Sequence, residues 1–174
     1  DFDSEVESVC PFCGVGCQVS LKVQEGKVKY GEGINGPANE GRLCVKGRFG
    51  FDYIHHPHRL TKPLIRREDA PAKGLNVDPG NLMTHFREAT WDEALEAAAG
   101  GMARLAQAHG GRAIAGFGSA KCTNEEAYLF QKLIRQGFKH NNVDHCTRLC
   151  HASSVSALLE NVGSGAVTAT FNEI

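Results

Sequence analysis

Four cysteines near the start of the sequence have the residue type and the spacing of a metal centre. Cys10, Cys13 and Cys17 lie within eight residues of one another, and Cys44 follows after a long interval. Four thiolates that converge on one place have few uses other than to hold a metal ion or a metal cluster. The N-terminal part of the chain is therefore predicted to be a metal site.

The spacing of these thiolates favours a 4Fe-4S cluster. Structural zinc sites usually present two close pairs, whereas here three close ligands precede a distant one. A cubane needs one thiolate per iron, so three ligands on a looped backbone can hold three corners while a remote residue closes the fourth. Gly14 and Gly16 let the chain turn tightly and bring backbone amides towards the sulfurs. Zinc and disulfide bonds are the less favoured alternatives.

A second group of reactive side chains lies near the C-terminal end, at Cys146, Arg148, Cys150 and His151. Apolar residues recur at helical spacing from Val155 onwards, which places Cys150 and His151 just before or within the first turn of a helix. A thiol there faces the positive end of the helix dipole, which favours the thiolate that binds a metal or attacks an electrophile. Without further context, the more ordinary interpretation is that Cys146 and Cys150 are small buried residues.

The elements that must position the first cysteines are predicted to be a small sheet and a loop. Polar and apolar residues alternate over residues 18–23 and again over residues 27–30, with Glu25 and Gly26 between them, which predicts a β-hairpin. Glycine, asparagine and proline over residues 31–41 predict a loop that returns the chain to the fourth cysteine. The residues that follow, 55–81, are rich in proline and charge and have the composition of a linker.

The rest of the chain has an α/β pattern. A capping box at residues 90–93 precedes an apolar stripe at helical spacing, which predicts an amphipathic helix. Residues 113–117 follow as a short buried strand that runs into Gly118 and Ser119, and a second capping box at residues 123–126 opens another helix. Helix, strand, glycine turn and helix in this order are typical of nucleotide binding, although such a turn alone is more often an ordinary tight connection.

Composition excludes several classes of protein. The 174 residues are 41% hydrophobic with a net charge of −1, and Lys and Arg are scattered, so the footprint of a nucleic-acid-binding protein is missing. No apolar run approaches the roughly 20 residues of a membrane span. We expect a cytoplasmic protein, or a periplasmic one if an upstream signal is missing. Because the chain begins at Asp1 and ends abruptly, we expect it to be a piece of a longer polypeptide.

The ordered combination of these motifs resembles the catalytic subunit of molybdenum- or tungsten-dependent formate dehydrogenases, which belong to the molybdopterin oxidoreductase superfamily. The resemblance runs over essentially the whole chain. Besides the cysteine spacing, it rests on residues 44–50, residues 58–64, the helix start at residues 91–95 and the pair formed by Cys150 and His151.

This resemblance implies a fold and its cofactors. A small β-rich module, residues 1–58, would bind the 4Fe-4S cluster, and residues 59–174 would be the incomplete beginning of an α/β domain that holds bis(molybdopterin guanine dinucleotide). Molybdenum and tungsten both accept thiolate and dithiolene sulfur, so the sequence fits either metal. The remainder of the polypeptide would supply most of the pterin pocket and a catalytic arginine, and the chain alone is expected to be inactive.

The resemblance also implies roles for single residues. Cys150 would be the thiolate ligand of the metal and His151 the catalytic histidine, whereas Cys122 and Cys146 have no ligand role and are expected to be structural. Lys46 would lie between the cluster and the pterin. The cluster ligands would be Cys10, Cys13, Cys17 and Cys44, and further candidates for cofactor contact are Gly118 and Ser119 in the glycine turn and Arg148.

The chemistry implied by the resemblance is the reversible oxidation of formate to CO2. It removes two electrons and a proton, so the metal would accept the electrons, His151 would take or relay the proton, and the cluster would pass the electrons on singly. The expected partners are iron–sulfur subunits and, in some assemblies, flavin or NAD subunits. Two alternatives stay open, a related nitrate reductase and a non-catalytic iron–sulfur subunit like that of respiratory complex I. The histidine directly after Cys150 argues against both.

Overall fold

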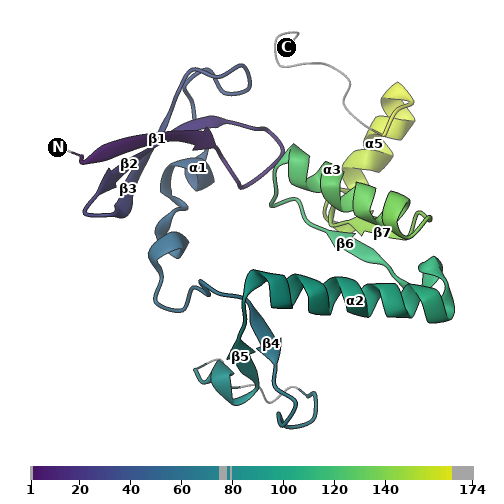
Figure 1. Ribbon diagram of the computed structural model, residues 1–174. Coiled ribbons are helices and arrows are strands. Elements are labelled where there is room, and N and C mark those ends of the chain that lie inside the picture. Colours follow the sequence, from purple (N-terminus) through teal and green to yellow (C-terminus); the bar gives the residue numbers. More distant parts are fainter. Residues whose placement is uncertain (1, 75–77, 79, 166–174) are drawn as a thin grey trace. The chain divides into compact units, whose positions relative to one another are not determined.

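A computed structural model describes residues 2–74, 78 and 80–165, and Figure 1 shows the order of the elements. The chain forms two units. One combines residues 1–57 with residues 114–174, and the other consists of residues 58–113. The division into domains of residues 1–58 and 59–174 follows the order of the sequence and stays a prediction.

The first unit begins with a three-stranded antiparallel sheet. Its strands β1 (Ser4–Val9), β2 (Gln18–Gln24) and β3 (Lys27–Gly33) are hydrogen-bonded in the order β1-β2-β3. The predicted hairpin of β2 and β3 is confirmed, and Glu25 and Gly26 both have positive φ, of 52° and 69°, as tight hairpin turns require. Strand β1 was not predicted. It is exposed along its whole length, so it lacks the buried face that marks a strand in the sequence.

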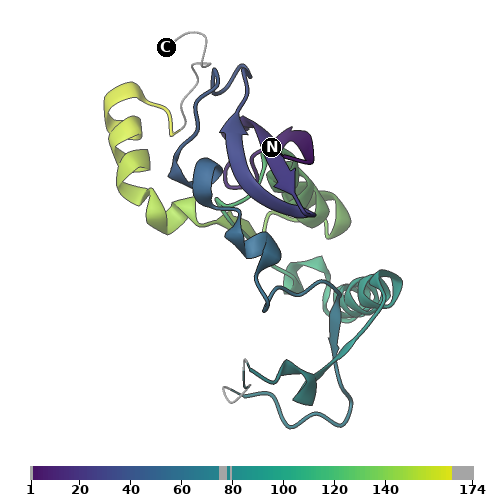
Figure 2. The ribbon, with the colours of Figure 1, turned by 90° about the vertical axis from the view of Figure 1, so that its left-hand side faces the viewer.

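The core of this module lies between the sheet and the segment that follows Cys44. Cys10, Val19 and Phe51 are buried, with Phe12 and Leu43 among the apolar side chains packed around them. Helix α1 (Val45–Phe49) lies against β3, as Figures 1 and 2 show, and a 3₁₀ helix (Asp52–His55) follows it. The predicted linker thus begins within this module.

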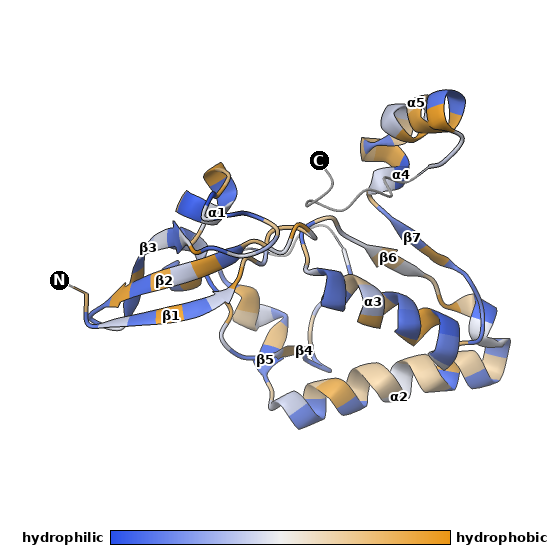
Figure 3. Cartoon of the chain, turned by 90° about the horizontal axis from the view of Figure 1, so that it is seen from above, coloured by the Kyte–Doolittle hydropathy of each residue, from blue (hydrophilic) through white to orange (hydrophobic). Residues whose placement is uncertain are grey.

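The remainder of the first unit is α/β. Strands β6 (Gly116–Gly118) and β7 (Val143–His145) are parallel and lie side by side, as Figure 3 shows. Between them come α3 (Asn124–Lys132) and a π-helical turn (Leu133–Gly137). Two further helices follow β7, α4 (Thr147–Cys150) and α5 (Ala152–Val162).

One detail of this region agrees with the sequence analysis in full, and a second agrees in part. The capping box of α3 is complete, because Thr123 Oγ accepts from the Glu126 amide and the Glu126 carboxylate accepts from the Thr123 amide. The strand predicted over residues 113–117 is present only from Gly116 to Gly118, and the prediction that it is buried is wrong at Phe117, which is 81% exposed. Ile134 is buried, and a Cβ built on Gly116 would lie 2.7 Å from its Cγ1, so the strand and the end of the α3 segment pack closely.

The second unit contains an antiparallel pair, β4 (Leu64–Arg66) and β5 (Phe86–Glu88), with a 3₁₀ helix (Leu82–Thr84) before β5. Helix α2 (Trp91–His109) and a 3₁₀ helix (Gly111–Ala113) complete it. The prediction of a linker over residues 55–81 is therefore wrong where β4 forms. The strand is only three residues long, so the surrounding proline and charge concealed it.

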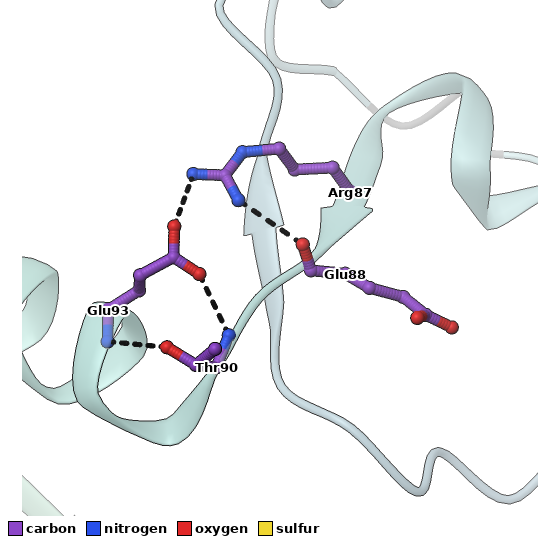
Figure 4. Close-up of polar contacts among 4 residues, drawn as sticks. All are labelled: Arg87, Glu88, Thr90 and Glu93. Carbon is purple, nitrogen blue, oxygen red and sulfur yellow. Dashed lines mark hydrogen bonds and ion pairs between the residues drawn. The ribbon is translucent and has the colours of Figure 1, made fainter.

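Helix α2 begins with the predicted capping box. Figure 4 shows Thr90 and Glu93 exchanging side chain-to-amide hydrogen bonds, of 2.8 Å from the Thr90 amide to Glu93 Oε2 and 3.2 Å from the Glu93 amide to Thr90 Oγ. Arg87 from β5 contacts the same carboxylate, at 3.3 Å from Glu93 Oε1. The start of α2 is thus fixed to the strand before it.

Candidate functional sites

Three of the predicted cluster ligands lie on the loop between β1 and β2, residues 10–17, which we call the cysteine loop. The amide of Cys10 donates to the carbonyl of Cys17 at 2.8 Å, which closes the loop at its base. Cys10 is 5% exposed, and Cys13 and Cys17 are partly buried. Gly16 has a φ of 74°, in the left-handed region that glycine enters without strain, as the prediction of a tight cysteine loop requires.

Cys44 is the residue that directly precedes α1. The nearby backbone amide of Gly47, and then that of Lys46, lower the pKa of the Cys44 thiol, and the Lys46 ammonium acts in the same direction. A Cβ built on Gly47 would lie 3.5 Å from Cys10 Sγ. Helix α1 therefore brings the fourth cysteine to the cysteine loop.

The four thiols are close enough to act on one another. Partial burial, followed by the negative charges of Cys10, Cys13 and Cys44, raises the pKa of Cys17. Four thiolates gathered in this way repel one another, and a multivalent metal centre relieves that repulsion. The donor set therefore fits a thiolate-bound cluster.

A single-ion site has a different geometry. Among the residues that the structure describes, no three His, Cys, Asp or Glu side chains surround one point as a single metal ion requires. A cubane spreads its ligands, because each thiolate binds a different iron.

The second reactive group is positioned by the junction of two short helices. Cys150 is the last residue of α4, and His151 is the N-terminal flanking residue of α5. Both residues therefore lie just before a helix, as predicted, but Cys150 also lies at the C-terminal end of another helix. The amide of Cys150 donates to Cys146 O at 2.9 Å, and the amide of Val155 donates to His151 O at 2.9 Å. The side chains of Cys146, Cys150 and His151 are exposed, so the interpretation of the two cysteines as buried residues is wrong for this chain.

Two of the remaining candidates, Gly118 and Ser119, lie on other elements than this pair, whereas Arg148 is in α4 with Cys150. Gly118 and Ser119, at the end of β6, line a cavity of about 540 Å³ that α3 and β7 also border. Partly buried Cys122 lines the same cavity, and its thiol donates to Ser119 O at 3.1 Å. Arg148 is exposed, with its Nε 3.6 Å from Asp144 Oδ2. The cavity and the helix junction are both near β7, but they are formed by different residues.

Sequence reasoning missed one contact between the cysteine loop and α3. Asn124, the first residue of that helix, donates from Nδ2 to Gly14 O at 2.6 Å. A Cβ built on Gly14 would lie 2.5 Å from Asn124 Oδ1, so the contact requires glycine there. A separation of 110 residues leaves no local signal from which this bond could be predicted.

Comparison with known families defines the class of protein to which this chain belongs. Residues 3–56 match the family model described as the molybdopterin oxidoreductase Fe4S4 domain, and residues 59–174 match the model described as molybdopterin oxidoreductase. The chain belongs to the molybdopterin oxidoreductases. The predicted fold class, a small β-rich 4Fe-4S module followed by the start of an α/β domain, is confirmed.

Individual relatives point to a narrower group. The F420-dependent formate dehydrogenase 2 subunit alpha of Methanococcus maripaludis is 39% identical over 170 residues, which cover 97% of this chain and 22% of the relative. The F420-dependent formate dehydrogenase subunit alpha of Methanocaldococcus jannaschii is 39% identical over 173 residues, with the same coverage. The probable oxidoreductase YjgC of Bacillus subtilis is 39% identical over 171 residues, or 98% of this chain and 16% of the relative.

The chain thus spans about a fifth of the length of these relatives. In the residues that the structure describes, no helix combines the length and the apolar character needed to cross a bilayer.

Proposed function

We propose that this chain is part of the catalytic subunit of a formate dehydrogenase that oxidises formate to CO2 reversibly. The observation that carries the proposal is the 39% identity to formate dehydrogenase alpha subunits over 97% of the chain. The gathering of four thiols in one module and the exposed Cys150–His151 pair in the other part of the same unit support it.

The first site would hold the 4Fe-4S cluster on Cys10, Cys13, Cys17 and Cys44. Backbone amides of α1 near the Cys44 sulfur stabilise negative charge there, and amides so placed tune the potential of a cluster. Lys46 is exposed beside this sulfur, where its positive charge favours the reduced and more negative state. We assign Lys46 to the path between the cluster and the pterin.

The second site would hold molybdenum or tungsten in bis(molybdopterin guanine dinucleotide), with Cys150 as the thiolate ligand. This group, when bound, supplies the two-electron acceptor for the reaction. Exposed Cys150 would be accessible to the metal, and the cavity of about 540 Å³ that Gly118 and Ser119 line would receive a phosphate group of the cofactor. The exposed guanidinium of Arg148 would attract the anionic groups of cofactor or substrate.

The side chain that handles the proton would be His151. An imidazole changes its protonation state near neutral pH and can take the proton that formate loses. The remainder of the polypeptide would complete the pterin pocket and exclude water, and partner subunits would receive the electrons from the cluster.

The test of the overall function uses the full-length protein. Molybdenum or tungsten beside iron, with turnover of formate and none of nitrate, is the expected result. Turnover of nitrate in place of formate would identify a nitrate reductase, and iron without either heavier metal would identify an electron carrier.

The test of the cluster ligands is the substitution Cys13→Ser. It is expected to remove the low-temperature resonance of the reduced cluster and to lower the iron content. Cys122→Ser is the matched control, because that thiol bonds to Ser119 O outside the cysteine loop. An unchanged resonance in Cys13→Ser would refute the assignment.

A further inference from the structure

We propose that Asn39 is a positioning residue that holds Cys17 and Cys44 at the separation at which both bind the cluster. The inference rests on the proposed function, because it takes these two cysteines as cluster ligands. Asn39 touches neither sulfur in this proposal, and it acts through the backbone next to each of them.

The side chain of Asn39 is the hydrogen-bonding centre of the loop that leads to Cys44. It is 8% exposed, and its Oδ1 accepts from the amide of Gln18 at 3.0 Å. Its Nδ2 lies within donating distance of three carbonyl oxygens, those of Gln18 at 3.2 Å, Ile34 at 3.1 Å and Arg42 at 3.0 Å. One carboxamide therefore contacts three separate points of the backbone.

Two of these three points lie next to or near the two cysteines in the sequence. Gln18 directly follows Cys17, and Arg42 comes two residues before Cys44. The Asn39 carboxamide pairs with both the amide and the carbonyl of Gln18, as a second peptide group would in a sheet. Through this side chain, the end of the cysteine loop and the approach to α1 become one rigid arrangement.

The loop leaves room for this side chain and depends on it. A Cβ built on Gly36 would lie 2.9 Å from Asn39 Oδ1 and 2.8 Å from the Gln18 side chain, so glycine is required at that position. Backbone groups that lose a hydrogen-bond partner away from water destabilise the arrangement that leaves them unpaired. Removal of the Nδ2 donor therefore favours opening of the loop, which separates Cys44 from the other three ligands.

The sharpest variant is Asn39→Asp, because it keeps the shape and the acceptor oxygen but removes the donor and adds a negative charge near three carbonyl oxygens. Asn35→Asp is the matched control, since it makes the same chemical change four residues earlier in the same loop, at an exposed side chain. Both are compared with wild type in the full-length protein. The readouts are iron content and the low-temperature resonances of oxidised and reduced cluster.

The expected result is that Asn35→Asp retains the wild-type iron content and reduced-cluster signal. The reduced-cluster signal of Asn39→Asp is expected to fall about tenfold or more below that of wild type, because at least one buried hydrogen bond is lost. It should show the oxidised-state resonance of a three-iron cluster, because one ligand is displaced while three stay in place.

A small thiol added during cluster reconstitution distinguishes a positioning role of Asn39 from a general loss of structure in the module. If only Cys44 is displaced, the added thiol supplies the missing fourth ligand and restores the four-iron signal in Asn39→Asp, as it should in Cys44→Gly. Should Asn39→Asp fail to accumulate as folded protein, Asn39→Ser, which retains a short donor, is measured in the same way and is expected to respond to the thiol.

Three outcomes would overturn the inference or its premise. A wild-type cluster in Asn39→Asp removes the positioning role. Loss of all iron in both Asn39 variants, without response to the thiol, makes Asn39 a general structural residue. A wild-type protein that binds no iron–sulfur cluster refutes the proposed function itself, and the comparison of variants then no longer applies.

Discussion

The two reactive regions of the first unit differ in how much of their surroundings this chain provides. In the cysteine module, Cys10 is 5% exposed within a core that includes Val19 and Phe51, and amides of the same module lower the pKa of the Cys44 thiol. At the helix junction, Cys150 and His151 are exposed and α5 has no buried residue. The first region builds its own site, whereas the second presents two reactive side chains to surroundings that we assign to the rest of the polypeptide.

This difference predicts which properties of the protein a substitution in each region should change. A change in the cysteine module should alter the geometry of the proposed ligands directly, because these cysteines, the loop and the core lie in the same module. A change at the helix junction removes a chemical group and leaves the local fold almost unaltered. The two regions should therefore be separable by substitution in the full-length protein.

The largest expected effect is that of Cys150→Ala. Loss of the proposed metal thiolate should abolish formate turnover, because the ligand tunes the metal, while the cluster signal and iron content stay at wild-type values. Turnover, iron content and low-temperature resonance are measured on the same preparation, with Cys146→Ala as the control for an exposed thiol of the preceding turn. Loss of the cluster in Cys150→Ala would show that the two regions are not independent.

His151→Gln should have the next largest effect. A positioned acid or base typically contributes about 10²–10⁴-fold to a rate, so turnover should fall by that factor while the metal content is retained. The pH profile of turnover should also change, since glutamine does not titrate near neutral pH. Near-normal turnover with an unchanged pH optimum would make the histidine structural and would weaken the formate dehydrogenase assignment.

The sequence predicted the parts of the molecule that local patterns determine. The turn at Glu25 and Gly26, the capping boxes of α2 and α3 and the place of Cys150 each depend on residues within a few positions of one another. Strand β4 escaped prediction because three residues are too few to show a period. The ligand roles of the four cysteines follow from their spacing and stay predictions, although the structure brings their thiols together.

Contacts between distant residues were beyond the sequence. The Asn124–Gly14 bond joins the start of α3 to the cysteine loop, and neither residue has a pattern that indicates the other. The Asn39 contacts have the same character, since a segment rich in glycine, asparagine and proline predicts a loop without revealing which asparagine is buried. Such contacts are decided by packing.

The Asn124–Gly14 bond joins the cysteine loop to α3, so its removal tests whether the stability of the loop depends on the α/β part of the unit. In Asn124→Ala, hydrogen exchange of the loop at residues 13–16 should be about fivefold faster, as expected for the loss of a hydrogen bond with a net contribution of about 1 kcal/mol. Exchange is measured by mass spectrometry on the full-length protein. Thr123→Ala is the control, because it weakens the N-terminal cap of α3 but retains the Asn124 side chain that donates to Gly14.

If Thr123→Ala speeds exchange of the loop as much as Asn124→Ala does, the effect comes from the stability of α3 rather than from the bond to Gly14. Equal exchange in wild type and Asn124→Ala would mean that the cysteine loop is held entirely by its own module.

The smallest effect is expected in the second unit, where the pKa of Glu93 is held below its ordinary value, first by the Thr90 amide and then by Arg87. A lowered pKa in the folded state contributes stability above the unfolded pKa, and this contribution is lost as the pH falls through the folded value. The protection of α2 against hydrogen exchange, measured relative to the intrinsic exchange rate at each pH, should therefore fall between about pH 5 and pH 3 in wild type and depend less on pH in Glu93→Gln. Glu96→Gln, on the same helix, should behave as wild type.

Neither reactive region includes Glu93, so the cluster signal and the formate turnover of Glu93→Gln at neutral pH should equal those of wild type. A loss of either would mean that helix α2 contributes to one of the two reactive regions.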